Sequence, residues 1–382
     1  MKQTVSLLLI VLMLCFVPIA HADNPTLKET DGLSGAVLME PTSRTRLWAK
    51  DADEKRMVAG LSKLPAILTL AQSVDDGSIS EEGKIRVSVR AAGILGPTAF
   101  LADGEEISAR DLIKAAVMIS AGDAIMALGE NAYGSESVFV ENINVTMHQL
   151  GLTTTVNDAL GTGLMLTAWE LATLGSAAAE STTFTKYCML YLDAITHSDG
   201  RETELVNANR LLKNYAGCKG LLTGSSSTDG YCGVFAAVRN GTNLVAVVIG
   251  AENATLRTTA AVTLLDYGFA NFRFEILCKA GAPMVKDVPV RDGDIRTVNL
   301  VPKETATAIF KTNQGKVTET LSAPEVIEAP VAVDVSVGSM EYRDESGNVI
   351  ATVPLYVERE IQAYGMKDIL LRILSQFINH AK

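Results

Sequence analysis

The sequence has few of the residues that mark metal-binding or disulfide-built proteins. Only five cysteines and four histidines occur among 382 residues, without a Cys-x-x-Cys pair or a close His/Cys cluster. A structural zinc site needs clustered ligands, and a disulfide scaffold needs many cysteines in a short chain. The sequence therefore predicts no metal, no cofactor and no disulfide framework.

Basic and aromatic residues are also scarce. Lys and Arg number 33 against 44 Asp and Glu, which gives a formal net charge of −11, and aromatic residues make up 5%. Phosphate binding needs basic patches, and none is found, so nucleic acid is not expected as a partner. The 48% of hydrophobic residues can bury a sizeable core, and the length favours two domains.

The first apolar run is too short for a membrane span of roughly 20 residues. It covers Val5 to Ile19, follows Lys2 and ends at Ala20-His21-Ala22. This three-part pattern is typical of a secretory signal peptide, here residues 1–22, with cleavage after Ala22. The sequence thus favours an extracytoplasmic protein; an uncleaved anchor is the alternative.

Loss of the signal peptide also removes Cys15 and leaves Cys188, Cys218, Cys232 and Cys278. Four cysteines allow three pairings. Cys218 and Cys232 flank an expected hairpin. Two alternatives are open: a disulfide between these two cysteines, or two buried free thiols.

Apolar periodicity and turn residues predict a mixed first domain. The expected strands are 34–40 and 45–50, and the expected helices are 61–75, 108–130, 137–150 and 166–179. Two apolar strands within 231–251 are joined by Asn240-Gly241, a strong hairpin signal. Strands at both ends with helices between them indicate an antiparallel sheet backed by helices.

The pattern changes after Pro283 to short β-type segments separated by Pro, Gly and Asp. This favours a small all-β sandwich. Residues 364–382 then place apolar side chains on one helical face, while Lys367, Asp368 and Arg372 rule out a span. This amphipathic helix is expected either to lie at a membrane surface or to pack on its own protein.

The stretch "MVAGLSKLPAIL", residues 57–68, has a lysine one turn into an apolar helix. Gly60 stands three residues before Lys63. A serine at Gly60 would complete the Ser-x-x-Lys of a serine acyl-transfer site.

This segment and three others, in the same order, carry a resemblance to a known family. The others are "LADGEEISARDLIKAAVMISAGDAIMALGE", "NANRLLKNYAGCKGLLTGSSSTDGYCGVFAAVRNG" and "LVAVVIGAENA". The chain resembles the secreted penicillin-binding serine-type D-Ala-D-Ala carboxypeptidases. The resemblance implies an α+β penicillin-binding transpeptidase/β-lactamase-like domain over 23–278, an all-β domain over 283–358 and an amphipathic helix over 359–382.

The family site combines Ser-x-x-Lys, Ser-x-Asn and Lys-Thr-Gly. The serine attacks the D-Ala-D-Ala carbonyl, the first lysine handles the proton, and backbone N–H groups receive the oxyanion. Each motif has lost one group here. The segments that match the three motifs, in the same order, are Gly60-Leu61-Ser62-Lys63, Ser120-Ala121-Gly122 and Leu222-Thr223-Gly224.

The resemblance therefore implies Lys63 and Ser120 as catalytic remnants, with Gly122, Leu222, Thr223 and Gly224 at substrate-binding positions. Ser62 is expected to point away from the face of Gly60, because residues two apart on a helix lie roughly 160° from each other. Lys219 is expected to point away from the cleft, because side chains alternate along a strand. Lys63 and Ser120 are expected to form a structural pair, although Ser120 could instead act as nucleophile with Lys63 as its base.

Three functions follow as hypotheses. The first is a catalytically inactive homologue that binds peptidoglycan stem peptide or a cell-wall protein in the inherited cleft. The second is an active carboxypeptidase with a rearranged serine site, and the third is a structural spacer of the envelope. Surface contact with the membrane through 364–382 is compatible with all three.

Overall fold

The structure, a computed structural model, describes residues 25–312 and 317–365. They form two compact units, one of residues 26–279 with 305–312 and one of residues 280–304 with 317–365. The expected signal peptide lies outside the described residues and stays a prediction. The helix expected over 359–382 is wrong for residues 359–365, which are not helical and form isolated β-bridges at Ile361 and Ala363. Its part from residue 366 onward lies outside the described residues. Among the described helices, none has the length and apolarity needed to cross a membrane.

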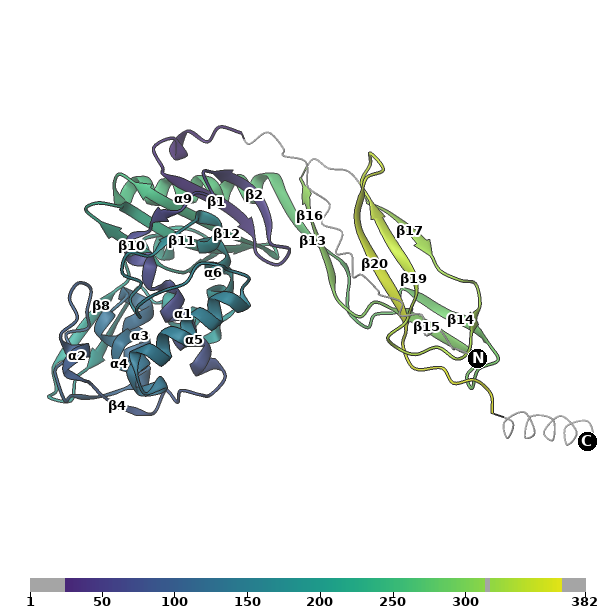
Figure 1. The fold of residues 1–382 in the computed structure, drawn as a ribbon. Helices are drawn as coiled ribbons and strands as arrows, with labels where there is room; N and C mark the ends of the chain where they lie inside the picture. Colours follow the sequence, from purple (N-terminus) through teal and green to yellow (C-terminus); the bar gives the residue numbers. More distant parts are fainter. Residues whose placement is uncertain (1–24, 313–316, 366–382) are drawn as a thin grey trace, which may run out of the picture. The chain divides into compact units, whose positions relative to one another are not determined.

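An antiparallel six-stranded sheet forms the centre of the larger unit (Figure 1). Its order is β10-β11-β12-β1-β2, and β9 pairs with the other half of β11. The strands are β1 (Gly35–Glu40), β2 (Thr45–Lys50), β9 (Cys218–Gly220), β10 (Thr223–Ser226), β11 (Gly230–Arg239) and β12 (Thr242–Ala251). The expected strands and the hairpin at Asn240-Gly241 are confirmed, with positive φ at both turn residues.

The sheet is buried on both faces. On β12, Val247 belongs to one buried cluster, whereas Ala246 and Val248 belong to the other. Because side chains alternate along a strand, an apolar strand of this kind needs a cover on each face. Helix α9 (Ala254–Asn271) packs on one face and α6 (Ala168–Glu180) on the other (Figure 1).

The remaining helices, 3-10 turns and two-stranded ribbons complete this unit. The helices and 3-10 turns are η1 (Lys28–Thr30), η2 (Ala59–Lys63), α1 (Leu64–Asp75), α2 (Val89–Ala92), α3 (Ala109–Ile119), α4 (Gly122–Tyr133), α5 (Glu136–Gln149), α7 (Thr182–Cys188) and α8 (Leu211–Asn214). The two-stranded ribbons are β3 (Arg56–Met57) with β6 (Met165–Leu166), β4 (Lys84–Arg86) with β5 (Glu106–Ser108), β7 (Leu192–Thr196) with β8 (Glu202–Val206), and β13 (Phe272–Cys278) with β16 (Ala306–Lys311).

The single helix expected over 108–130 is wrong, because the chain turns at Ser120. This residue adopts the left-handed conformation, with φ 55° and ψ 40°, and ends α3 before α4 begins. The corner is held by the Asp123 carboxylate, which accepts hydrogen bonds from the N–H groups of Ala99 and Leu101. Apolar periodicity continues through both helices and conceals this break.

Two further differences concern the start of one helix and a helix that was not expected. The helix expected over 61–75 begins as the 3-10 turn η2, and only residues from Leu64 onward are α-helical. Helix α9 is not among the expected helices. Its core face consists largely of small and medium residues such as Ala260, Ala261 and Leu264, which weaken the apolar signal.

The bridge between Cys218 and Cys232 that was left open is excluded by the sheet register. Cys218 lies opposite Ala237, and Cys232 stands five residues away from Ala237 on β11. Five residues of strand span about 16 Å, far beyond the ~7 Å Cα separation that a disulfide tolerates. All four described cysteines are free thiols.

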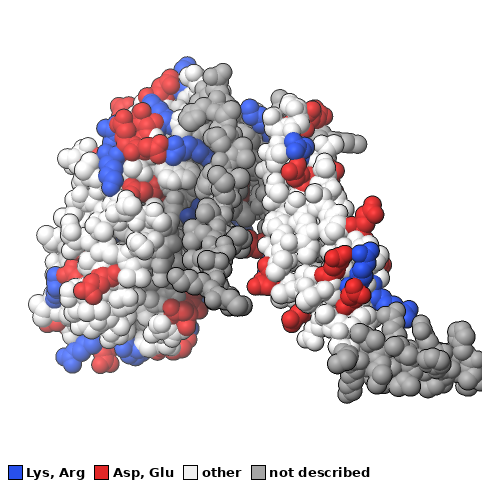
Figure 2. Space-filling model, turned by 45° about the vertical axis from the view of Figure 1, so that its right-hand side comes forward, with Lys and Arg blue, Asp and Glu red and all other residues white. Residues whose placement is uncertain are grey.

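The smaller unit is all-β, as expected. Its strand order is β17-β19-β20-β15-β14-β18, around a core that includes Leu300, Leu355 and Val357. The strands are β14 (Val285–Arg291), β15 (Thr297–Val301), β17 (Thr318–Ser322), β18 (Ile327–Glu328), β19 (Ser336–Arg343) and β20 (Val349–Val357). On the molecular face drawn in Figure 2, acidic and basic side chains of the described residues are interspersed.

Candidate functional site

An open cleft of about 800 Å³ in the larger unit is built around the motif positions. Its walls come from η2, the Ser120 corner, the 160–164 loop, the end of β8, strand β10 and the start of α9. The motif residues that line the cleft are Gly60, Lys63, Ser120, Thr223 and Gly224. Gly122 and Leu222, expected at substrate-binding positions, are not on its wall.

Gly60 brings backbone, and no hydroxyl, to the position where the family has its nucleophile. Residues three apart in a 3-10 turn lie above one another, so Gly60 and Lys63 share a face of η2. A Cβ added at Gly60 would meet only Gly224 Cα, at an ordinary 3.4 Å. In the other direction, a Cβ at Gly224 would lie 2.7 Å from the Gly60 nitrogen, so Gly224 is what lets β10 approach η2.

Lys63 is 9% exposed and binds a backbone carbonyl. Its Nζ donates to the Ser120 oxygen of the main chain at 2.9 Å. The expected pairing of Lys63 with Ser120 therefore occurs, but through the carbonyl and not through the hydroxyl. Burial lowers the pKa of the Lys63 ammonium, and the negative charge of Asp123 opposes this shift.

The lowered pKa of Lys63 predicts a pH-dependent stability. The unfolded chain binds the lysine proton up to a pKa of 10.5, whereas the folded chain releases it at lower pH. The free energy of unfolding should therefore rise with pH in the window that ends near 10.5, relative to a Lys63→Met variant. Urea unfolding of both proteins at increasing alkaline pH measures this difference. A difference that is flat with pH would show that the lysine titrates normally.

The neighbourhood of Gly122 is closed to a longer side chain. A Cβ at Gly122 would lie 2.8 Å from Ile94 Cγ2, 3.3 Å from Lys63 Nζ and 3.6 Å from Leu160 Cδ1. Ile94 and Leu160 thus crowd the space into which an asparagine side chain would extend. Ser120 stays on the cleft wall beside them.

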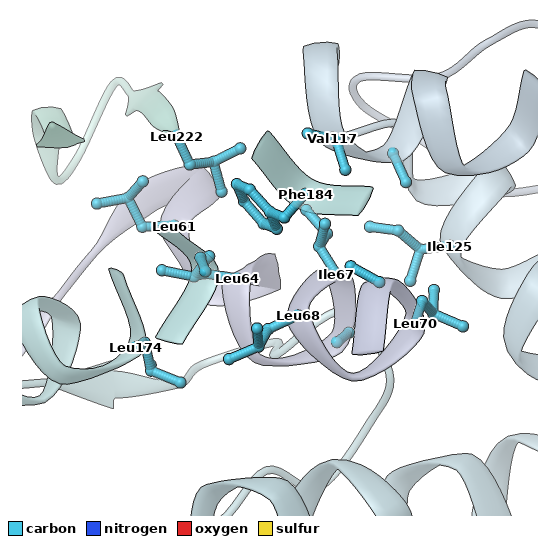
Figure 3. Close-up of a cluster of buried hydrophobic side chains, with 14 of the residues drawn as sticks. Leu61, Leu64, Ile67, Leu68, Leu70, Val117, Ile125, Leu174, Phe184 and Leu222 are labelled. Atoms are coloured by element: carbon cyan, nitrogen blue, oxygen red, sulfur yellow. The ribbon is translucent and has the colours of Figure 1, made fainter. Parts of the chain in front are cut away.

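Leu222 faces the hydrophobic core. It is 2% exposed and belongs to the same buried cluster as Leu61 and Phe184 (Figure 3). The expected substrate-binding position of Leu222 is therefore corrected to a core position. Its neighbours Thr223 and Gly224, which follow it on β10, are the residues that reach the cleft.

Ser62 and Lys219 do not supply the missing serine hydroxyl of the first motif or the missing lysine of the third. Ser62 lies at the cleft rim, where its Oγ donates to the Leu160 carbonyl oxygen at 3.0 Å. Lys219 is exposed and is not on the cleft wall. The strand alternation that was used to place Lys219 does not apply, because Leu221, with φ 80°, separates β9 from β10.

Arg257 is a cleft residue that the motif comparison misses. It lies on the first turns of α9, is 4% exposed, and its Nη1 contacts the carbonyl oxygens of Gly224 and Cys232, each at 3.4 Å. Its Nε has no hydrogen-bond partner among the described residues. Burial lowers the pKa of Arg257, and yet a guanidinium in a protein stays charged. Arg257 also lines the cleft, so its guanidinium brings a positive charge to an anionic ligand there.

The sequence did contain a signal for this residue. Arg257 is in phase with Ala260, Ala261 and Leu264, which are buried on the sheet-facing side of α9. An arginine in phase with core positions needs a partner, because buried charge is costly. The signal was missed together with the helix.

The cleft also has an exposed cation and an apolar rim. Arg210, at the beginning of α8, lines the cleft, and the apolar lining residues Leu95 and Met57 are exposed. Among the described residues, no group of three or more His, Cys, Asp or Glu side chains is arranged to hold a metal ion.

Known proteins resemble the chain along both units. Residues 25–253 match the family model of D-alanyl-D-alanine carboxypeptidases, and residues 274–363 match that of the penicillin-binding protein 5 C-terminal domain. The chain is 28% identical to D-alanyl-D-alanine carboxypeptidase DacF of Bacillus subtilis, with 99% of each chain covered. It is 28% identical to DacC of Escherichia coli, with 92% of this chain and 90% of DacC covered.

A solved structure shows the same fold. Penicillin-binding protein 5 from Haemophilus influenzae superposes with a TM-score of 0.77 at 24% identity, covering 87% of this chain and 98% of that chain. This confirms the predicted fold class, a helix and sheet penicillin-binding domain followed by a β-sandwich domain. The chain belongs to the D-alanyl-D-alanine carboxypeptidase family.

Proposed function

We propose that this chain binds peptides that end in a free carboxylate, such as peptidoglycan stem peptides, and does not cleave them. One observation carries the proposal: glycine occupies the nucleophile position of a cleft that keeps a buried, partly unpaired arginine. The relatives are named D-alanyl-D-alanine carboxypeptidases, which supports a stem peptide as the ligand. The place of action that fits this ligand is outside the cytoplasmic membrane.

The surroundings of Gly60 support the loss of catalysis. Lys63, the group that would move the proton, donates to a backbone carbonyl. Gly122 stands at the Asn position of the second motif and is crowded by Ile94. Leu222 stands at the Lys position of the third motif and packs in the core. Catalytic groups of this kind act as a unit, so a ligand held here lacks both the attacking atom and its activation.

Binding has support of its own. Arg257 and Thr223 both line the cleft beside β10, the strand against which an extended peptide would lie, since β10 is the last strand in its sheet. An edge strand offers main-chain hydrogen bonds to an added strand. A guanidinium pairs with a carboxylate through charge-assisted hydrogen bonds, which are about twice as strong as neutral ones.

The test measures labelling and affinity on the same protein. After treatment with benzylpenicillin, intact-mass spectrometry should show no acyl adduct. In calorimetry, an N-acetylated peptide ending in D-Ala-D-Ala should bind at least about tenfold more tightly than the same peptide with a C-terminal amide. Arg257→Lys keeps the charge but loses the planar fork, and it should reduce that ratio.

Two outcomes would overturn the proposal. An adduct that disappears in Ser120→Ala would show an enzyme with Ser120 as nucleophile, because Ser120 lies on the cleft wall beside Lys63. Equal, negligible affinity for the acid and the amide would favour a spacer of the envelope.

A further inference from the structure

Two arginines from different elements line one cleft, and we infer that together they select a peptide whose last residue carries two carboxylates. This rests on the proposed function, because it names the ligand class of the same cleft. The terminal carboxylate would pair with Arg257, and a side-chain carboxylate of the same residue would pair with Arg210.

The two arginines differ from most arginines of this unit. Arg46, Arg110 and Arg239, for example, each pair with an acidic side chain. For Arg210 and Arg257, no ion pair occurs within residues 25–312 and 317–365. Arg44 and Arg86 also have no ion pair within these ranges, but only Arg210 and Arg257 of these four lie on the cleft wall.

The guanidiniums approach the cleft from two directions. Arg257 comes from α9 and reaches the back of β10, where it contacts the Gly224 carbonyl. Arg210 follows the end of β8, after Asn207 and Ala208, which also line the cleft. The two charges are within electrostatic reach of each other: besides burial, the positive charge of Arg210 lowers the pKa of Arg257.

One carboxylate satisfies only part of this arrangement. A carboxylate pairs with a guanidinium in a two-pronged geometry, which occupies both of its oxygens. A second cation would then remain unpaired beside the first, and the two repel each other. A second carboxylate on the ligand removes this repulsion and adds its own charge-assisted hydrogen bonds.

The charge of the cleft favours an anion in spite of the acidic chain. The cleft contains the cations Lys63, Arg210 and Arg257 and one carboxylate, Asp229. The Asp229 carboxylate accepts hydrogen bonds from the hydroxyls of Ser226 and Thr228. The net charge of −11 repels anions in general, so this local excess of positive charge concentrates anionic ligands at one place.

The experiment uses two N-acetylated peptides that differ in one charge, ending in D-Ala-D-Glu and in D-Ala-D-Gln. Calorimetry at low salt should give about tenfold tighter binding of the D-Glu peptide to the full chain. In Arg210→Ala this preference should fall to about one, because the D-Glu peptide loses far more affinity than the D-Gln peptide. Arg210→Lys should keep part of the preference, and Arg257→Lys should weaken both peptides.

Other results overturn the inference and separate it from the proposed function. If both peptides bind alike and Arg210→Ala changes nothing, the second anion position does not exist, although peptide binding stands. If Arg210→Ala weakens both peptides equally, the two arginines share one carboxylate. If neither peptide binds, and D-Ala-D-Ala does not bind either, both proposals fail.

Discussion

The Gly60→Ser variant is expected to fold like the parent chain and still to release D-alanine at least about a thousandfold more slowly than B. subtilis DacF. The serine fits, because its Cβ would lie 3.4 Å from Gly224 Cα. Turnover fails because Lys63 donates to the Ser120 carbonyl and the other two motifs lack their polar groups. A coupled D-alanine assay on N-acetylated D-Ala-D-Ala peptide, with DacF in parallel, measures the difference.

Restoring the second motif as well is expected to destabilise the fold. Adding Gly122→Asn to Gly60→Ser should cost about 1–3 kcal/mol in the free energy of unfolding, because the new Cβ would lie 2.8 Å from Ile94 Cγ2. Shortening Ile94 to alanine in the same chain should recover part of that loss. Appreciable D-alanine release by Gly60→Ser alone would show that the Asn and Lys positions are not needed here.

The Leu222→Lys variant, which rebuilds the third motif by sequence, is expected to lose about 3–5 kcal/mol in the free energy of unfolding. Leu222 is 2% exposed and packs with Leu61 and Phe184, where an ammonium has no counter-charge among its core neighbours (Figure 3). Leu222→Met is the matched control and should cost less than about 1.5 kcal/mol, because it conserves apolar volume. Urea unfolding of the three proteins gives the comparison.

The pH dependence distinguishes a buried lysine from simple misfit. Burial lowers the pKa of an introduced lysine, so the unfolded state binds more protons than the folded state at pH values between the folded and unfolded pKa. The deficit of Leu222→Lys should therefore shrink as pH rises toward about 10.4. A cost below about 1 kcal/mol at neutral pH would mean that the side chain reaches the solvent of the cleft.

Local patterns were sufficient for the elements whose signals lie in neighbouring residues. The hairpin at Asn240-Gly241 formed as expected because both residues tolerate positive φ. The strands at 34–40 and 45–50 also match. The break at Ser120 could not be seen in this way, since it depends on Asp123 binding the backbone of a separate loop at Ala99 and Leu101.

The site residues divide in the same way into those that the motifs identified and those that only the packing of distant segments placed. Reading the motifs identified Gly60, Lys63 and Ser120, and the cleft wall includes all three. It placed Leu222 wrongly, because a motif position does not tell which side of the strand faces the core. It missed Arg257, which is far from the motifs in sequence and contacts the Gly224 carbonyl only through the packing of α9 on the sheet.

The order of residues by itself determined that the chain has a carboxypeptidase-like frame and that a hydroxyl, an amide and an amine are absent from its motifs. Those are facts of covalent composition, which no folding alters. Only the tertiary structure decided what took their places: Ile94 against Gly122, the core around Leu222, and two arginines on the cleft wall. These neighbours come from distant segments, and burial and charge act on them only after the chain has packed.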